Sequence, residues 1–371
     1  MPLASMIKFW IIPPLILIAA FVISALASAA FTQLVIRGGP VDRPRARGSH
    51  STPTATSGGM AIMAATALGI AIFSLLFHTQ LPRDGGHGFA LLIYAALLGL
   101  SGALDDMLAL NARFKLLFQV ALALGFASAY PIINIDFGFG AAISLWPWLG
   151  VLGTAFWLVL GLNTINFMDG SNGLAIGSQS IALGLMVIMI IVLGPLSERT
   201  YYAAGLLLIC VCALGAHLGF LPFNLPMGKV FQGDAGSLFG GALITGGVLL
   251  MIHAGVTSLW LGGYVLAPLL VDVLLTLALR AKSGAKLFEA HKDHLYQQWL
   301  IHKDPSHLNM ALRVWGLSAF SGAVGLTMRY IHIETGLNLR FVALVALFWL
   351  FAVGWLWLRY KISADSAAKT A

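Results

Sequence analysis

Long runs of apolar residues follow one another along almost the whole chain, separated by short polar stretches. Most runs are close to the roughly 20 residues that a helix needs to cross a hydrocarbon core. The first run starts at Lys8 as a signal peptide would, but no cleavage site followed by a soluble domain comes after it, so we interpret it as a span. The eleven runs predict membrane-spanning helices near residues 8–36, 57–79, 88–104, 116–132, 147–165, 175–194, 201–221, 236–254, 257–279, 312–331 and 340–358.

The composition agrees with this pattern. Of 371 residues, 59% are hydrophobic and only 9% are charged, whereas about a quarter of the residues of a soluble domain are charged. We therefore expect an all-α, polytopic integral membrane protein in which residues 1–371 form a single membrane-embedded domain. Cys210 and Cys212 stand two positions apart in an apolar helix and point to different sides, so no disulfide is expected between them.

Lysine and arginine are divided unevenly when successive loops are assigned to alternate sides. One set of loops contains sixteen of these residues and the other contains five. Cytoplasmic loops carry the excess of positive charge, so this division predicts an N-terminus outside and a C-terminus inside the cell. The polar clusters that could support chemistry all fall in the predicted cytoplasmic loops, near residues 37–56, 105–115, 163–174, 221–236 and 280–312. This arrangement suits an enzyme that takes a soluble substrate from one compartment and a lipid from the bilayer.

Asp105 and Asp106 are adjacent carboxylates at the end of the third predicted span, in a chain with only fourteen acidic residues. Neighbouring carboxylates repel each other and resist desolvation, so a pair at a membrane boundary requires a cation. A metal ion or the basic residues Arg113 and Lys115 could supply it. The alternative is a helix end solvated among lipid headgroups, and this pair alone does not decide between the two.

The segment 163–173 places polar groups at helical spacing. Asn163, Asn166 and Asp169 recur at three-residue steps, so two amides and a carboxylate share one helix face. The glycines that follow permit a turn or a close approach of the backbone to a ligand. Pairing between helices would explain one asparagine, but it explains the whole group poorly.

The segment 231–237 places Asp234 just before an apolar span. Its glycines expose backbone N–H groups near a helix N-terminus, which favours binding of a phosphate or of a phosphate bridged by a metal. Phe231 could stack on a nucleobase, although an isolated phenylalanine more often serves packing. Asn224 precedes this segment by seven residues.

The segment 289–297 contains His291 and His294, with Lys292 between them. Two histidines three residues apart could bind a metal, but this pattern alone is weak, and phosphate recognition is favoured over it. The carboxylates of the other clusters favour magnesium, or manganese in its place, over zinc, because hard oxygen donors suit hard cations.

Taken together, these motifs resemble those of the polyprenyl-phosphate N-acetylhexosamine-1-phosphate transferases, glycosyltransferase family 4. The resemblance covers most of the chain and includes the segment 47–54 with Gly58 and Gly59. It implies a magnesium-dependent transfer of an N-acetylamino-sugar 1-phosphate from a UDP-sugar to undecaprenyl phosphate, which gives a polyprenyl-diphospho-sugar and UMP. Members of the family begin the synthesis of peptidoglycan lipid, teichoic acid, enterobacterial common antigen and O-antigen in the bacterial inner membrane.

The resemblance also implies a role for each acidic residue. Asp105 matches the base that deprotonates the lipid phosphate, with Asp106 beside it and Lys115 near the phosphates. Asp169 and Asp234 match carboxylates at the magnesium and diphosphate centre, and Asp234 is the firmer metal ligand of the two.

The same resemblance implies which residues bind the substrates. His291 and His294 match a histidine motif that helps to hold the diphosphate, and two further positions match the uridine pocket, Asn224 and Phe231. The complete set implied to bind substrate is His50, Thr54, Asn163, Asn166, Asn172, Asn224 and Phe231.

Two departures from the family pattern bear on the donor. Many relatives have a second aspartate where this chain has Asn172, which removes a charge from that position. The histidine loop, with Tyr296 and Gln297, looks closer to the O-antigen and capsule branch than to the pentapeptide transferase. It favours UDP-GlcNAc, UDP-QuiNAc or UDP-FucNAc over the muramoyl pentapeptide, without choosing among them.

Two other functions compete with this interpretation. A transporter or lipid flippase requires ionisable groups inside the bilayer, and Asp272 is the main one available. An intramembrane prenyltransferase is expected to have Asp-x-x-Asp motifs, but no third aspartate follows Asp105 and Asp106. We expect Asp272 to have an auxiliary role near the cytoplasmic end of its span. Anionic substrates and membrane lipids account for the net charge of +7 without nucleic acid, and the sequence leaves open whether the protein forms a homodimer.

Overall fold

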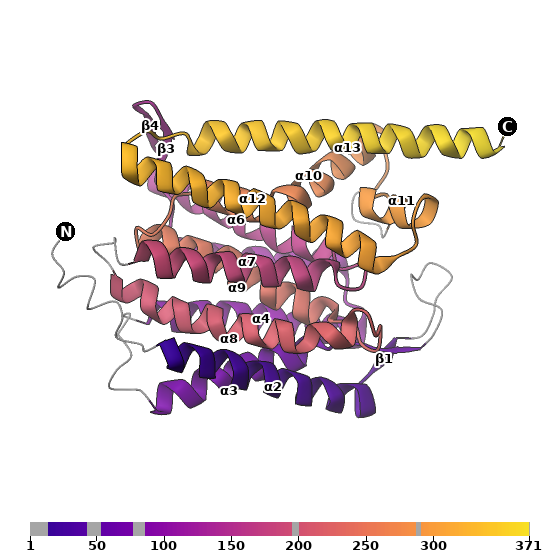
Figure 1. The fold of residues 1–371 in the computed structure, drawn as a ribbon, viewed down its shortest axis with the longest axis horizontal. Coiled ribbons are helices and arrows are strands. Elements are labelled where there is room, and N and C mark those ends of the chain that lie inside the picture. Colours follow the sequence, from indigo (N-terminus) through magenta and orange to yellow (C-terminus); the bar gives the residue numbers. More distant parts are fainter. Residues whose placement is uncertain (1–13, 43–52, 77–85, 195–199, 287–290, 371) are drawn as a thin grey trace.

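The structure is a computed structural model that describes residues 14–42, 53–76, 86–194, 200–286 and 291–370, and it is almost entirely helical (Figure 1). A short helix, α11 (Leu295–His302), and two antiparallel ribbons accompany the long helices. The ribbons pair β1 (Val41–Asp42) with β2 (Thr54–Ala55) and β3 (Asn134–Gly138) with β4 (Ala141–Ser144). The long helices are α2 (Pro14–Gly38), α3 (Gly59–Leu76), α4 (His87–Leu108), α5 (Ala112–Ala129), α6 (Pro147–Phe167), α7 (Leu174–Leu193), α8 (Thr200–Asn224), α9 (Gly233–His253), α10 (Trp260–Lys282), α12 (His307–Thr335) and α13 (Arg340–Thr370).

Each predicted span corresponds to one of these long helices. Within the described residues, ten helices are long and apolar enough to cross a membrane. The remaining one, α12, has 29 residues, but polar side chains such as Ser318, Ser321 and Arg329 interrupt its apolar sequence. It nevertheless packs against α7 and α10 within the bundle (Figure 1). The prediction of an all-α, multi-pass membrane protein is confirmed.

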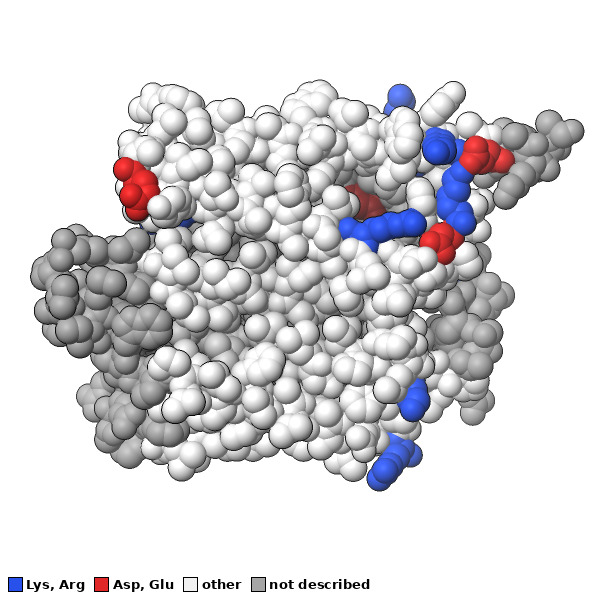
Figure 2. All heavy atoms as spheres, viewed as in Figure 1, with Lys and Arg blue, Asp and Glu red and all other residues white. Residues whose placement is uncertain are grey.

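The long helices run along a common direction, so the bundle has two ends, which carry different elements. One end, called the site end here, contains β1, α11 and the C-terminus of α13, and the other end contains the β3–β4 ribbon (Figure 1). Figure 2 shows that most of the lysine and arginine visible on this face gathers at the site end. The polar motifs at the ends of α4, α6 and α10 therefore meet at one end of the molecule.

The β3–β4 ribbon was not predicted by the apolar pattern and lies in the loop between the fourth and fifth predicted spans. Its Asp136 accepts a hydrogen bond of 2.8 Å from Asn338 and lies 3.4 Å from Arg340 at the start of α13. The carbonyl of Asp136 also accepts a bond of 2.7 Å from Trp260 at the start of α10. The ribbon thus ties together the starts of α10 and α13.

Helix α9 forms the centre of the bundle, where it packs against α3, α4, α6, α7 and α8. Every residue from Ala235 to Met251 is buried. Small residues allow this close approach: a side chain at Gly241 would meet Leu162 of α6, and one at Gly246 would meet Leu91 of α4. The N-terminus of α9, and with it Asp234, is therefore held in the middle of the site end.

Candidate active site

A polar cavity of about 430 Å³ opens at the site end. Its walls come from the ends of α4 and α6, the loop before α9 and the loop before α11, which are far apart in the sequence. Eight of the residues that the sequence analysis singled out line it: Asp106, Asn166, Asp169, Asn172, Asn224, Phe231, Asp234 and His291. The fold thus brings the separate polar motifs together at one site.

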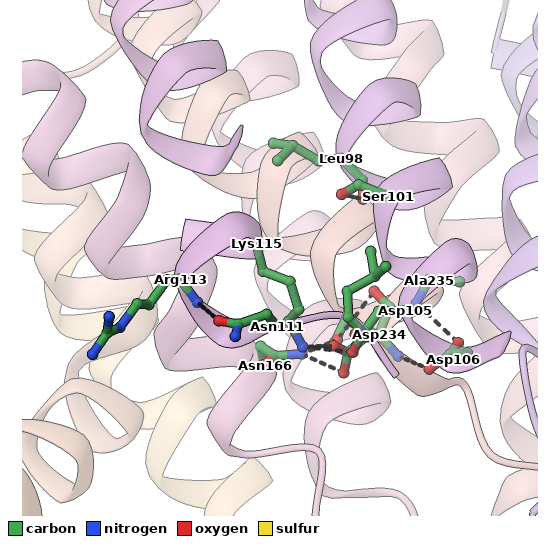
Figure 3. A network of polar contacts seen from close by, with 12 residues as sticks. Leu98, Ser101, Asp105, Asp106, Asn111, Arg113, Lys115, Asn166, Asp234 and Ala235 are labelled. Carbon is green, nitrogen blue, oxygen red and sulfur yellow. Dashed lines mark hydrogen bonds and ion pairs between the residues drawn. The ribbon is translucent and has the colours of Figure 1, made fainter. Parts of the chain in front are cut away.

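Lys115, at the start of α5, joins two of the aspartates (Figure 3). Its Nζ lies 2.5 Å from Asp105 Oδ2 and 2.8 Å from Asp234 Oδ2. The other oxygen of Asp105 accepts a bond of 2.7 Å from the backbone amide of Leu110, which follows α4. This lysine holds a carboxylate from the end of α4 beside one from the start of α9, at the edge of the cavity.

Asp106 occupies the N-terminus of α9 from outside that helix. Its carboxylate accepts hydrogen bonds from the backbone amides of Asp234, at 2.9 Å, and Ala235, at 3.3 Å, and from the hydroxyl of Ser57 at 3.3 Å. A carboxylate is stabilised there by unpaired N–H groups and by the helix dipole. Gly233 adopts φ +66°, and a side chain on it would collide with Asp106, so glycine is required at this contact.

Asp169 lies in the turn that ends α6 and is enclosed by the cavity wall. It accepts a hydrogen bond of 2.7 Å from Gln232. Burial raises the pKa of Asp169 well above its usual range, and the nearby carboxylates of Asp234 and Asp106 raise it further, although the bond from Gln232 opposes them. This group therefore lacks full electrostatic compensation in the protein alone.

Asn166, one turn before Asp169, orients the central aspartate. Its Nδ2 donates to Asp234 Oδ1 at 2.9 Å and to the hydroxyl of Ser237 at 2.9 Å. Together with Lys115, this amide fixes both oxygens of Asp234. The predicted shared face of the 163–173 segment thus contributes Asn166 and Asp169 to the site.

Asn224 and Phe231 form another part of the cavity wall. Asn224 is buried; its Oδ1 accepts a bond of 2.6 Å from the amide of Gly173, and its Nδ2 donates to Val230 at 2.8 Å. Phe231 is held by backbone bonds of 2.9 Å to Ala55 and from Gly58. This wall is therefore rigid, and it combines an aromatic ring with buried amide groups.

The two histidines of the loop before α11 have different surroundings. His291 lines the cavity, whereas the ring of His294 is buried behind it, with 5.0 Å between the two ring centroids. Burial, assisted by the positive charge of Arg280, lowers the pKa of His291. Burial, together with the neighbouring His291, lowers the pKa of His294 to about 3, so His294 is neutral near pH 7.

Two other residues singled out from the sequence do not line the cavity, and a third cannot be placed. Asn163 does not line the cavity; its Nδ2 donates to Gln119 at 2.8 Å and to the carbonyl of Val159 at 2.8 Å. Thr54 is buried in β2, and its neighbour Thr56 lines the cavity instead. His50 lies outside the described residues.

The structure adds Gln232 to the site residues chosen from the sequence, and it also places at the site Tyr296, which the sequence indicated only as a feature of the family branch. Gln232 belongs to the same motif as Asp234, two residues earlier, and its position there was a usable signal. Tyr296 lines the cavity, and its hydroxyl donates to the carbonyl of Phe167 at 3.0 Å. No periodic pattern marked Tyr296, because its role depends on a contact between α11 and the end of α6.

A second cavity, of about 590 Å³, adjoins the polar one at Tyr296, which lines both. It lies between α10, α11, α12 and α13 and is walled almost entirely by apolar side chains, including Leu269, Leu317 and Phe351. The site therefore combines a carboxylate-rich chamber with an apolar one.

The donors around the polar cavity fit a magnesium ion. Four aspartates lie in or beside it, and all of their donor atoms are hard oxygens, as Mg²⁺ prefers. Within the described ranges, no three His, Cys, Asp or Glu side chains are already grouped as a metal site. Mg²⁺ is usually coordinated by one or two protein carboxylates together with substrate phosphates and water.

Comparison with known proteins identifies the family. Residues 88–253, which contain most of the aspartates described above, match the glycosyl transferase family 4. A probable undecaprenyl-phosphate N-acetylglucosaminyl 1-phosphate transferase of Bacillus subtilis (strain 168) is 27% identical over 81% of this chain and 78% of that protein. A decaprenyl-phosphate N-acetylglucosaminephosphotransferase of Mycobacterium tuberculosis (strain CDC 1551 / Oshkosh) is 29% identical over 82% and 80%.

A phospho-N-acetylmuramoyl-pentapeptide-transferase of Geobacillus sp. (strain WCH70) is 31% identical over 64% of this chain and 75% of that protein. The names of the first two relatives describe transfer of N-acetylglucosamine phosphate to a polyprenyl phosphate, and the name of the third describes transfer of a phospho-N-acetylmuramoyl-pentapeptide. The residues matched by the family include the carboxylates that converge on the polar cavity. The chain belongs to the polyprenyl-phosphate N-acetylhexosamine-1-phosphate transferases, glycosyl transferase family 4.

Proposed function

We propose that this protein transfers an N-acetylamino-sugar 1-phosphate from a UDP-sugar to undecaprenyl phosphate, giving a polyprenyl-diphospho-sugar and UMP. The observation that carries this proposal is the meeting of the two cavities at Tyr296. A lipid phosphate requires an apolar space for its chain and a polar space for its head. The chain would lie in the apolar cavity, and the phosphate would reach the aspartates beside Lys115.

The polar cavity suits the nucleotide half of the donor. Phe231 offers a ring on which a uracil base could stack, and Asn224 stands beside it. His291 and Lys292 on the opposite wall suit the diphosphate, because an imidazole and an ammonium both donate hydrogen bonds to phosphate oxygens.

An acetamido sugar without a peptide is the proposed donor sugar. The transferases of N-acetylglucosamine phosphate named above align with about four fifths of this chain, and the pentapeptide transferase aligns with 64%. Asn172, which lines the cavity, replaces a charged residue of many relatives with a neutral amide. UDP-GlcNAc, UDP-QuiNAc and UDP-FucNAc are the donors to compare.

The reaction is a displacement at phosphorus. An oxygen of the lipid phosphate attacks the β-phosphorus of the donor; the bond from this phosphorus to the bridging oxygen breaks, and UMP leaves with that oxygen. Asp105 accepts the proton of the lipid phosphate. Lys115 then places a positive charge between the reacting anions, and Asn166 keeps Asp234 oriented.

Asp234 and Asp169 would hold the magnesium ion, or manganese in its place. Such an ion, when bound, neutralises charge on the transferring phosphate and on the UMP that leaves. The number of negative charges supports a bound cation at this site. Without one, two anionic substrates would meet four carboxylates.

We place the protein in a bacterial inner membrane, with the site end and the C-terminus in the cytoplasm and the N-terminus in the periplasm. The uneven division of lysine and arginine between the loops supports this orientation. UDP-sugars are made in the cytoplasm, which agrees with a site at that end. The product would begin a cell-surface glycan, O-antigen or a related polymer.

The test is incorporation of radiolabelled sugar from each UDP-amino sugar into undecaprenyl phosphate by purified protein, with magnesium or with EDTA. We expect lipid labelling with equimolar release of UMP, dependent on magnesium and lost in Asp234→Ala. Glu334→Gln, which changes a carboxylate on the exposed surface of α12, serves as the matched control and retains activity. Folded wild-type protein that labels no lipid with any donor would refute the proposal and favour a transport function.

A further inference from the structure

Asp272 is a buried carboxylate of α10 that lines the apolar cavity but not the polar one, and the reaction described above gives it no chemical step. Its Oδ1 accepts hydrogen bonds from the backbone amide of Leu295 at 2.8 Å, from the indole of Trp355 at 2.8 Å and from Thr276 at 3.2 Å. A buried carboxylate with three donors on one oxygen is fixed in position. It connects α10 with the start of α11 and with α13.

The start of α11 depends on Asp272, because the residue at its N-cap, His294, provides no side-chain cap. Leu295 is the first residue of α11, and its amide is bonded to Asp272 instead. A negative charge at this position also opposes the positive end of the helix dipole. The carboxylate of α10 therefore replaces a local cap for the short helix that follows the histidine loop.

Helix α13 contributes two contacts to the same region. The buried Trp355 donates to Asp272, and one turn later Arg359 donates to the carbonyl of Asp293 at 2.7 Å. Asp293 also forms an ion pair with Arg280 of α10. The loop residues 291–294 are thus held between α10 and α13 from the side facing away from the cavity.

From this support, a chain of contacts leads to the cavity. The ring of His294 stacks with those of His291, at 5.0 Å between centroids, and Tyr296, at 6.0 Å. Both of these neighbours line the polar cavity. Tyr296 in turn donates to the carbonyl of Phe167, which lies just before the turn that contains Asp169.

We propose that Asp272, Trp355 and Arg359 form a support that positions the histidine loop, so that the C-terminal half of α13 is a positioning element of the active site. None of the three lines the polar cavity, although Asp272 and Trp355 line the apolar one; we infer that they act on the polar cavity through His291 and Tyr296. The kinetic part of this inference rests on the proposed function, and the structural part does not.

The first variant to test is Trp355→Phe, which keeps an aromatic ring and removes the indole donor together with part of the ring volume. Trp349→Phe is its matched control, because Trp349 lies on the same helix and its side chain is 69% exposed. Asp272→Asn is the second variant, since it preserves the shape and removes the charge at the start of α11.

Hydrogen exchange followed by mass spectrometry, on the full-length protein in detergent, measures the support directly. We expect peptides from residues 291–302 to exchange several-fold faster in Trp355→Phe and Asp272→Asn, and at the wild-type rate in Trp349→Phe. Exchange at the wild-type rate in both variants would overturn the proposal, whether or not the protein has transferase activity.

Kinetics test the link to the site. We expect Trp355→Phe to raise the KM for the UDP-sugar roughly fivefold, as loss of one hydrogen bond would, and to change kcat by less than twofold. In a His291→Ala background the same substitution should raise the KM further by less than twofold, because only the route through Tyr296 remains. Effects that multiply would show that Trp355 acts by another route and would overturn the proposal. A wild-type protein without transferase activity, but with faster exchange in Trp355→Phe, would support the positioning element and refute only the proposed function.

Discussion

Asp106 Oδ1 accepts a hydrogen bond of 2.9 Å from the backbone amide of Asp234. Asp106, at the end of α4, thus fixes the start of α9, which carries Asp234. The two motifs are therefore coupled in position. The side chain of Asp234 is left to face Lys115 and Asn166. The geometry of the central carboxylate therefore depends on a residue that is 128 positions away in the sequence.

We predict that Asp106→Asn lowers both stability and activity. The NH₂ group of the new asparagine side chain would face the backbone N–H of Ala235 and the hydroxyl of Ser57, which are themselves donors. The negative charge at the start of α9 would also be lost. This should cost about 1–2 kcal/mol of unfolding free energy. Thermal unfolding in detergent and initial rates of lipid labelling check it. A variant with wild-type melting temperature and turnover would show that the contact does not organise the site.

Lys115→Gln should reduce kcat by roughly 10²–10³, the usual effect of removing one preorganised charge or donor from a transition state. Asp105 and Asp234 would then face each other without the ammonium between them. Arg113→Gln is the control, since Arg113 is exposed near the same helix start and points away from the network (Figure 3). Equal losses in the two variants would indicate a general effect of surface charge.

Asp169→Asn should raise the magnesium concentration needed for half-maximal activity, by about tenfold or more if Asp169 is a ligand or supports one. Burial, and then the nearby carboxylates of Asp234 and Asp106, raise the pKa of Asp169, and a bound cation would compensate its negative charge. A magnesium titration of lipid labelling after removal of metal with EDTA measures this concentration. An unchanged magnesium dependence, with activity retained, would remove Asp169 from the metal site.

Tyr296→Phe removes the donor to the carbonyl of Phe167 without changing the packing of the ring. We expect kcat to fall about fivefold, because the turn bearing Asp169 loses one of its fixed contacts. Tyr330→Phe, at a side chain that is 57% exposed, provides the control. If Tyr296→Phe and the control have the same kcat, the hydroxyl has no role at the junction of the two cavities.

The protein should lose stability as the pH falls below about 6.5, in part because of His294. Burial, with the charges of His291 and Arg280, lowers its folded pKa to about 3, whereas an unfolded histidine titrates near pH 6.5. Between these values the unfolded state binds more protons, so the unfolding free energy decreases with falling pH, by up to about 1.4 kcal/mol per unit.

Melting temperatures between pH 5 and pH 7 check this dependence. His294→Asn should flatten it, and His302→Asn, at an exposed position of α11, should leave it unchanged. A steep decrease that persists in His294→Asn would assign the acid sensitivity to other groups.

The sequence predicted the helical bundle and most of the cavity lining for a physical reason. Carboxylates and amides are rare in an apolar chain, so Asp106, Asn166 and Asp234 were conspicuous at the ends of spans. Alternation of the spans then placed those ends on one side. Their convergence on one cavity follows from the two facts together.

Side-chain direction could not be predicted in the same way. Asn163 shares a predicted helix face with Asn166, yet it bonds to Gln119 of α5, because the end of α6 faces α5 as well as the cavity. His294 belongs to the same motif as His291 but turns toward α10. Asp272, expected to be auxiliary, contacts Trp355, which is 83 residues away. Such outcomes depend on packing between distant helices, which no local pattern contains.

The burial of α9 also determines what happens to the product. Because that helix is surrounded on all sides, the aspartate at its start can be approached from the site end or from the neighbouring apolar cavity, but not through the bundle from the β3–β4 end. If the proposed function holds, a sugar transferred here would stay on the leaflet from which the donor arrived. Movement of the product across the bilayer would then be a separate step, which requires a different protein.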